Sequence, residues 1–292
     1  MIYSGQVWFI PTAVMFPVPK LTVVSFFSKI LDELTGFALF LLSKFRWSTL
    51  ECFACHAALH SATCHQALLM LRQYWWKILS IVFLLYTFTA GFLGHVPVKP
   101  ILNETIRNLY FHVAMWFSMM IFFIVSVIYS VRYLRSNNPV LDIYAVAYAK
   151  TGIVFGLMGL VTGSIWARYT WGDFWSNDPK QLGAAIALLI YLAYFVLRNS
   201  MTDLDKRARI SAVYNVFAFA MLFPTIWIIP RMVESLHPGG MGNPALDTKD
   251  IDSRMRIIFW FGAIPGWALL GTWITTLYIR VKLLNEKKLT NV

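Results

Sequence analysis

Charged residues are scarce in this sequence: they make up 13% of its 292 residues, about half of the roughly 25% typical of a soluble globular chain. Hydrophobic residues make up 58% and aromatic residues 16%. A folded protein of 33.5 kDa still needs a polar shell in water, and this composition cannot supply one. The sequence therefore indicates a membrane protein.

Cysteine is also scarce. The three cysteines all lie between Cys52 and Cys64, and the 16 glycines show no period, which excludes a disulfide scaffold and a collagen-like fibre. The net charge of +11 does not indicate a nucleic-acid partner, because the basic residues stand in short groups between apolar runs. That arrangement is typical of a chain that crosses the lipid bilayer several times.

Asp, Glu, Lys and Arg are absent from six apolar runs of about 17 to 25 residues, the length that crosses a hydrocarbon core as a helix. The runs are Ile78–Gly94, Leu109–Val131, Thr151–Ala167, Gln181–Leu197, Ile210–Pro230 and Ile257–Ile279. A lone strand would leave its backbone unpaired in lipid, so each run is expected to be helical. The sequence predicts an all-α polytopic membrane protein with a six-transmembrane-helix bundle.

The distribution of Lys and Arg predicts the orientation of this bundle. Twelve of these residues flank the helix ends on one side and eight flank those on the other. Because Lys and Arg favour the cytoplasmic face, we expect both ends of the six-helix unit to be cytoplasmic. The connections 95–108, 168–180 and 231–256 are then external.

Residues 1–69 are expected to form a peripheral or poorly ordered extension, with the six-helix domain at 70–292. Leu21–Leu42 is apolar, but Lys29, Asp32 and Glu33 lie in its middle, where each charge costs roughly 2.5–3.5 kcal/mol in a spanning helix. Met70 begins a short basic and aromatic lead-in to the first run, so it is an alternative start of the protein.

The N-terminal extension also contains Cys52-Phe53-Ala54-Cys55-His56, which satisfies the C-x-x-C-H pattern of haem attachment. Attachment requires external thiols, and the expected topology places these inside. Cys52, Cys55, His60 and His65 have spacings that a zinc knuckle would accept, although the segment lacks the usual glycines. A non-functional extension is the preferred interpretation.

The segment between the third and fourth runs is exceptionally aromatic. Gly163–Lys180 contains Trp166, Tyr169, Trp171, Phe174 and Trp175, together with Gly172 and the cations Arg168 and Lys180. An interfacial aromatic belt explains Trp166, but not the Trp-Gly-x-x-Trp spacing followed by Asp178-Pro179. Aromatic faces, a glycine and flanking cations suit a flat, apolar, anionic ligand such as haem, whose propionates would meet Arg168 or Lys180.

Trp171-Gly172-Asp173-Phe174-Trp175-Ser176-Asn177-Asp178 resembles the WWD signature of the haem-handling proteins of cytochrome c assembly, CcmC, CcsA and their relatives. Asn177 departs from the signature by replacing its last Trp. The resemblance covers about Met70 to Val292. It also includes Tyr110-Phe111-His112-Val113 and Ser235-Leu236-His237-Pro238-Gly239, which are similar to the two histidine motifs of that family.

The resemblance implies an external WWD loop between the third and fourth helices and an inner-membrane location. It further implies that His112 and His237 are axial ligands of a transiently bound haem b, because imidazole is a standard axial ligand of haem iron. Trp166, Trp171, Gly172 and Trp175 would form the stacking surface, and Asp178 would fix the loop or meet a partner. His95 is a weaker candidate for a supporting role.

The implied function is non-enzymatic: the protein presents or exports haem for c-type cytochrome biogenesis. Its implied partners are a periplasmic haem chaperone or apocytochrome c, and other assembly membrane subunits. An alternative is a secondary transporter for another aromatic substrate, although such carriers usually have ionisable residues within their spans. A cytochrome b-like oxidoreductase would need facing pairs of mid-membrane histidines, and only His112 lies within a run.

Overall fold

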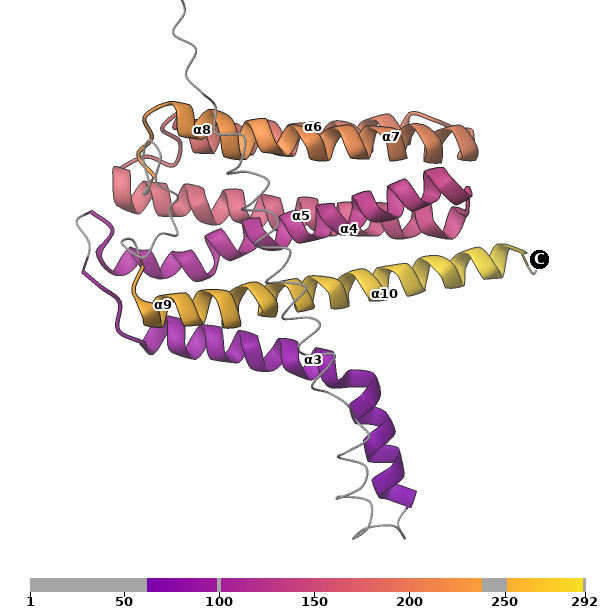
Figure 1. The fold of residues 1–292 in the computed structure, drawn as a ribbon, viewed down its shortest axis with the longest axis horizontal. Helices are drawn as coiled ribbons and strands as arrows, with labels where there is room; N and C mark the ends of the chain where they lie inside the picture. Colours follow the sequence, from indigo (N-terminus) through magenta and orange to yellow (C-terminus); the bar gives the residue numbers. More distant parts are fainter. Residues whose placement is uncertain (1–61, 99–100, 238–250, 291–292) are drawn as a thin grey trace, which may run out of the picture. The chain divides into compact units, whose positions relative to one another are not determined.

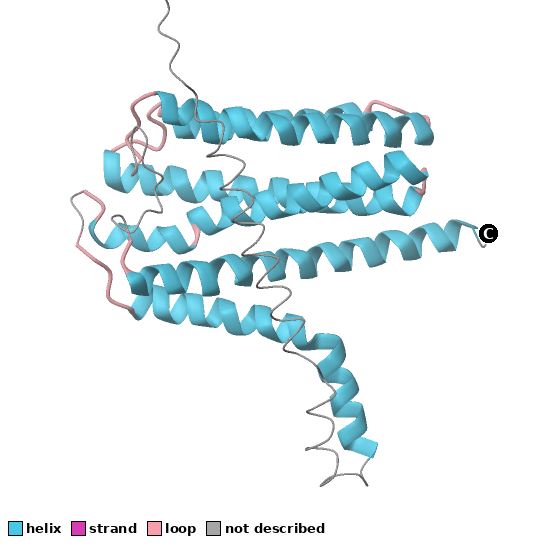
Figure 2. Cartoon of the chain, viewed as in Figure 1, coloured by secondary structure: helices cyan, strands magenta, loops and turns pink. Residues whose placement is uncertain are grey.

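The computed structural model describes residues 62–98, 101–237 and 251–290. The chain divides into two compact units, Met1–Leu71 and Arg72–Val292, and nearly all of the described residues belong to the second. The predictions made for Leu21–Leu42, Cys52, Cys55, His56 and His60 lie outside the described residues. In the described ranges the chain is helical with short connections and contains no strand (Figure 2).

Six helical segments account for the fold; five contain a predicted run in full, and α3 contains the first run except its last residue, Gly94. They are α3 (Ala62–Leu93), η1 (Asn103–Tyr110) with α4 (His112–Ser136), α5 (Pro139–Trp171), α6 (Pro179–Asn199), α7 (Leu204–Leu222) with η2 (Phe223–Ile228) and α8 (Ile229–Met232), and α9 (Ser253–Ile257) with η3 (Ile258–Ala263) and α10 (Ile264–Thr290). All six contain a segment that is long and apolar enough to cross a membrane. The prediction of six spanning helices is confirmed.

Helix α5 is longer than Thr151–Ala167, the apolar run predicted within it. α5 begins after Asn138, whose side chain accepts a hydrogen bond from the N–H of Val140, and it continues to Trp171. Gly172 ends it with a φ of 95°, a left-handed conformation that glycine adopts without steric cost. The connection expected at 168–180 is therefore shorter, 172–178, and its first aromatic residues are helical.

Successive helices alternate in direction, so their ends fall into two sets (Figure 1). The beginnings of α4, α6 and α9 lie at the same end of the bundle as the ends of α5 and α8. The two short connections 137–138 and 200–203 lie at the opposite end. Both histidine motifs and the WWD-like segment consequently meet at one end of the helices.

α4 and α5 pack closely because α5 presents glycines to large side chains of α4. A Cβ at Gly152 would overlap Phe123, and one at Gly156 would overlap Met119. The same register continues to the end of α5, where Gly159 faces Trp116 and Gly163 faces His112; the ring of His112 occupies the space that a Cβ on Gly163 would need. The position of His112 is thus set by helix packing.

The opposite end of the bundle contains a buried ion pair. Arg198, in the last turn of α6, donates from Nη1 to Oδ1 of Asp142 at 2.9 Å and from Nη2 to Oδ2 at 2.5 Å. Asp142 lies in the first turn of α5. The two side chains are only 11% and 13% exposed. The two parallel hydrogen bonds give the buried guanidinium and the buried carboxylate each a partner of opposite charge.

Candidate functional site

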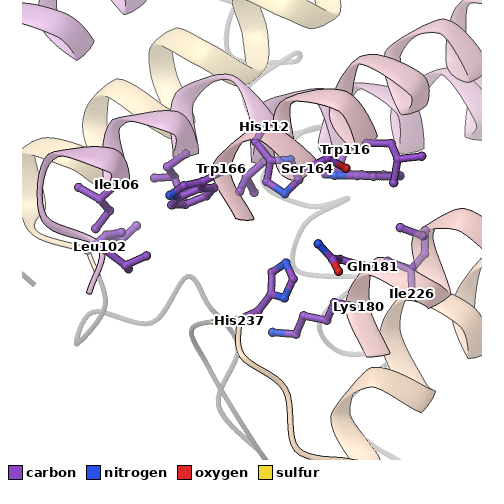
Figure 3. Close-up of a pocket in the computed structure, with 16 residues that line it drawn as sticks. Leu102, Ile106, His112, Trp116, Ser164, Trp166, Lys180, Gln181, Ile226 and His237 are labelled. Carbon is purple, nitrogen blue, oxygen red and sulfur yellow. The ribbon is translucent and has the colours of Figure 1, made fainter. Parts of the chain in front are cut away.

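A cavity of about 240 Å³ lies at the end of the bundle where the histidine motifs meet (Figure 3). Most of its wall is apolar, and its polar side chains come from α4, α5, α6 and the connection after α8. The lining residues are Leu102, Ile106, Leu109, His112, Val113, Trp116, Leu160, Gly163, Ser164, Trp166, Lys180, Gln181, Ala184, Ile226, His237 and Ile251. His112 and His237, which are 125 positions apart, therefore face the same space.

His112 is the first residue of α4, and its ring is held against α5. Its Nδ1 lies 2.8 Å from the carbonyl oxygen of Gly159. A carbonyl oxygen can only accept a hydrogen bond, so Nδ1 carries the proton and donates it. The other ring nitrogen, Nε2, then has a lone pair and is able to bind a metal.

His237 is held by an acidic partner in the same way. Its Nδ1 lies 2.8 Å from Oδ1 of Asp178, whose side chain is 1% exposed. Asp178 also accepts hydrogen bonds from the hydroxyl of Ser235 and from the N–H groups of Leu236 and Lys180. One carboxylate therefore caps α6 and joins it to the segment that carries His237.

The ionisation state of Asp178 follows from these contacts. Burial favours the neutral acid and would raise the pKa of Asp178, but the hydrogen bonds from His237, Ser235 and Lys180 stabilise the carboxylate. The net effect holds the pKa of Asp178 well below its usual range. The ionised Asp178 accepts a hydrogen bond from Nδ1 of His237, and this bond fixes the orientation of the ring.

Figure 3 shows the two imidazoles on opposite sides of the cavity and pointing toward one another. Each has its Nδ1 hydrogen-bonded to a backbone carbonyl or a carboxylate, which fixes the ring orientation and leaves Nε2 without that partner. No group of three or more His, Cys, Asp and Glu side chains suited to a metal ion occurs in the part of the chain that the structure describes. Two imidazoles facing one space could hold a haem iron between them.

Trp166 is the tryptophan of the aromatic segment Gly163–Lys180 that lines this cavity. Its indole N–H donates to Oγ1 of Thr105 at 2.9 Å, which joins the end of α5 to η1. Its ring lies edge-on to the His112 ring with centroids 5.8 Å apart. Trp166 thus contributes both to the wall of the cavity and to the packing of one imidazole.

Trp171 and Trp175 do not line the cavity. The Trp171 ring packs on the outer side of the site against His237, with centroids 4.9 Å apart. Trp175 is 40% exposed, and its indole N–H donates to Oδ1 of Asn177 at 2.8 Å. Asn177 has a φ of 55°, a left-handed conformation that asparagine tolerates better than most residues. In this chain Asn177 therefore positions the Trp175 side chain.

Arg168 and Gly172 belong to a separate, exposed hollow that is lined by Ile165, Arg168, Tyr169, Gly172 and Phe174. The Arg168 guanidinium donates to the carbonyl oxygen of Gly172 and lies 5.8 Å from the centre of the Phe174 ring. His95 is exposed and lines neither this hollow nor the cavity. The nine residues selected from the sequence therefore do not form one surface. His112, Trp166, Lys180 and His237 line the cavity, Arg168 and Gly172 line the exposed hollow, and Trp171, Trp175 and Asp178 line neither.

Sequence reasoning did not identify several residues of the cavity. Ile106 and Leu109 come from η1, and Leu102 directly precedes it. Ile226 comes from the π-helical η2, in which Pro224 has no N–H to donate. Gln181 is the first residue of the predicted run Gln181–Leu197, and its polar amide at the end of an apolar run could have marked it as a candidate. Its side chain is buried and lines the cavity beside Lys180.

The fold and the site define a multi-pass membrane protein that holds two metal-competent imidazoles in an apolar cavity at one end of its helices. Residues 56–291 match the family model described as "CcmC: Heme exporter protein C". The chain therefore belongs to the CcmC family. The family resemblance inferred from the motifs is confirmed.

Individual relatives agree with this assignment. A Heme exporter protein C of Bradyrhizobium diazoefficiens is 30% identical over 150 residues, which cover 50% of this chain and 56% of that protein. One of Rhodobacter capsulatus is 27% identical over 218 residues, 72% of this chain and 85% of that protein. A cytochrome c biogenesis protein CcsA of a Synechococcus strain is 33% identical over 88 residues, 30% of this chain and 29% of that protein. The match thus spans about half the length of the first relative.

Proposed function

We propose that this protein binds haem transiently in the cavity between His112 and His237 and presents it for c-type cytochrome biogenesis. The observation that carries the proposal is the shared geometry of the two imidazoles. Each donates its Nδ1 proton to a fixed acceptor and keeps Nε2 for the iron. Haem b, which has no covalent link to the protein, suits a site that must release its ligand.

The wall of the cavity suits a porphyrin. Leu102, Ile106, Val113 and Leu160 supply apolar surface for the macrocycle, and Trp166 adds an aromatic ring. Lys180 supplies positive charge for a propionate. The cavity, at about 240 Å³, is smaller than the roughly 300–1,000 Å³ of typical ligand pockets. A macrocycle bound there would extend beyond it, which gives a partner access to the haem.

The outer aromatic residues have supporting roles in this proposal. Trp171 packs against the His237 ring, and Asp178 fixes the orientation of the same ring through a hydrogen bond. Arg168 and Gly172 line the separate exposed hollow and Trp175 is exposed, so in this proposal an incoming partner would meet these residues. The proposed partners are a haem chaperone or apocytochrome c, together with other membrane subunits of the assembly system. The proposed activity is binding and presentation, without a catalytic step.

A haem titration tests the proposal directly. Haem supplies an iron that takes two imidazole ligands, so the purified protein is expected to give a Soret band that saturates at one haem per chain. The band shape should be that of haem with two nitrogen ligands. A protein that binds another aromatic substrate in place of haem would give no saturable Soret change, and this result would favour the transporter alternative.

The orientation can be tested with reporter fusions. In the proposed inner-membrane topology, fusions at Asn199 and at the C-terminus are expected to be cytoplasmic, whereas fusions at Ser176 and Gly240 are expected to be external. The physical basis is the 12-to-8 bias of Lys and Arg toward the end opposite the cavity. A cytoplasmic signal at Ser176 would contradict presentation of haem outside the membrane.

A further inference from the structure

Gln181 has a buried donor group that the protein itself leaves unused. It lies in the first turn of α6 and is 7% exposed. Its Oε1 accepts hydrogen bonds from the N–H of Ser176 at 3.0 Å and from the hydroxyl of Ser176 at 3.1 Å. Because a backbone N–H can only donate, these contacts identify which end of the amide is oxygen. The other end, Nε2, has no hydrogen-bond partner.

This unused donor is directed into the cavity. Gln181 lines the cavity together with His112, Lys180 and His237, and Figure 3 shows its amide nitrogen turned toward the space between the two imidazoles. A buried N–H group without an acceptor is costly, and such groups in folded proteins usually have a water or a ligand as their partner. The fixed Oε1 prevents the amide from turning its nitrogen elsewhere without losing both contacts with Ser176.

The acceptor can be identified from the chemistry of the site, on the assumption that haem occupies it as proposed above. A haem that His112 and His237 held would occupy the space between the two imidazoles, and Gln181, which lines that space, would lie beside it. The pyrrole nitrogens bind the iron, and the hydrogen-bond acceptors at the edge are the two propionate carboxylates. Gln181 neighbours Lys180 at the beginning of α6, where the helix dipole also favours an anion.

We infer that Gln181 is a specificity-determining residue whose amide N–H donates to a propionate carboxylate of the bound haem. It fixes the rotation of the haem about the axis that joins the two histidines, which axial ligation alone leaves free. It also makes the cavity selective for porphyrins with a free carboxylate, because an esterified analogue would remove the charge that strengthens this hydrogen bond.

The test compares haem with its dimethyl ester in equilibrium titrations of the purified full-length protein at pH 8. Gln181→Glu keeps the oxygen that Ser176 uses but places a negative charge beside the propionate. Its haem affinity is expected to fall about tenfold or more, as for the loss of a hydrogen bond to a charged group. Its affinity for the dimethyl ester is expected to change less than about threefold, because the ester has no charge to repel.

Gln181→Leu is the second variant, since it removes the donor without adding a charge. We expect it to weaken haem binding and to reduce the preference of the wild-type protein for haem over the ester. The Soret maximum should stay at the wild-type position in both variants, because both axial histidines remain. Gln73→Glu and Gln73→Leu are the matched controls, because Gln73 is exposed, lies outside the cavity and allows the same two changes; both should keep the wild-type preference.

The outcomes separate this inference from the proposed function. A wild-type protein that binds haem, combined with Gln181 variants that lose equal affinity for haem and ester, would show that Gln181 only supports the fold near Ser176. Unchanged haem affinity in both variants would also overturn the inference. Failure of the wild-type protein to bind either porphyrin would overturn the proposed function, and the inference with it.

Discussion

Alanine in place of His112 or His237 is expected to remove one axial ligand of the haem iron and to shift or abolish the Soret band. The loss of affinity should exceed the roughly 10–100-fold that removal of a ligand's hydrogen-bond partner costs, because here the ligand itself is lost. Added imidazole should partly restore the spectrum by occupying the vacated position. Absorbance titration of the two purified variants measures both effects.

His95→Ala provides a matched control for these variants. His95 is exposed and does not line the cavity, so its replacement should leave the affinity and the band position at wild-type values. Wild-type spectra in both the His112 and the His237 variants would exclude the proposed ligation. A wild-type spectrum in only one of them would leave a single protein ligand for the iron and would place the other histidine in a supporting role.

Gly163→Ala is expected to have the second largest effect, although Gly163 has no side chain that could touch iron. The added methyl group would occupy the space of the His112 ring and would push the ring away from the Gly159 carbonyl. Loss of that hydrogen bond should lower haem affinity by about 10–100-fold, the usual effect of losing the partner of a metal-binding histidine. Haem titration and the position of the Soret band measure the change.

The same substitution two turns earlier in α5 separates ring displacement from general damage to the helix pair. A Cβ at Gly156 would press on the side-chain ends of Leu188 and Met119, which can move, and it is remote from His112. Gly156→Ala should therefore disturb α4–α5 packing without changing the Soret band. Equal loss of haem in both variants would mean that the packing of the two helices, and not the position of His112, controls binding.

The number of spanning helices was predictable because it depends on a local property. A charge-free run long enough to cross the bilayer has to be a helix, whatever its neighbours are. The ends of the helices were less predictable, since the charge criterion stopped the third run at Ala167. The chain continues as helix to Trp171, Gly172 adopts the left-handed conformation that ends it, and Arg168 is accommodated in the last turn.

The residue types of the site were partly predictable because they stand in short, local motifs. His112, His237 and Trp166 stand in short motifs whose residue types already indicate haem. The orientation of side chains was not predictable from those motifs. Asp178 contacts His237 across 59 positions of sequence, and His112 contacts Gly159 across 47. Such pairs depend on how α4, α5, α6 and the connection after α8 pack, which no local spacing encodes.

The ion pair at the far end of the bundle links two helices that also build the cavity. Asp142 in the first turn of α5 and Arg198 in the last turn of α6 join these helices at the end opposite the cavity. At the cavity end, α5 carries Trp166 and α6 carries Gln181. Because a two-bond ion pair restrains how one helix slides along the other, it also restrains the relative positions of two cavity-lining side chains that it does not touch.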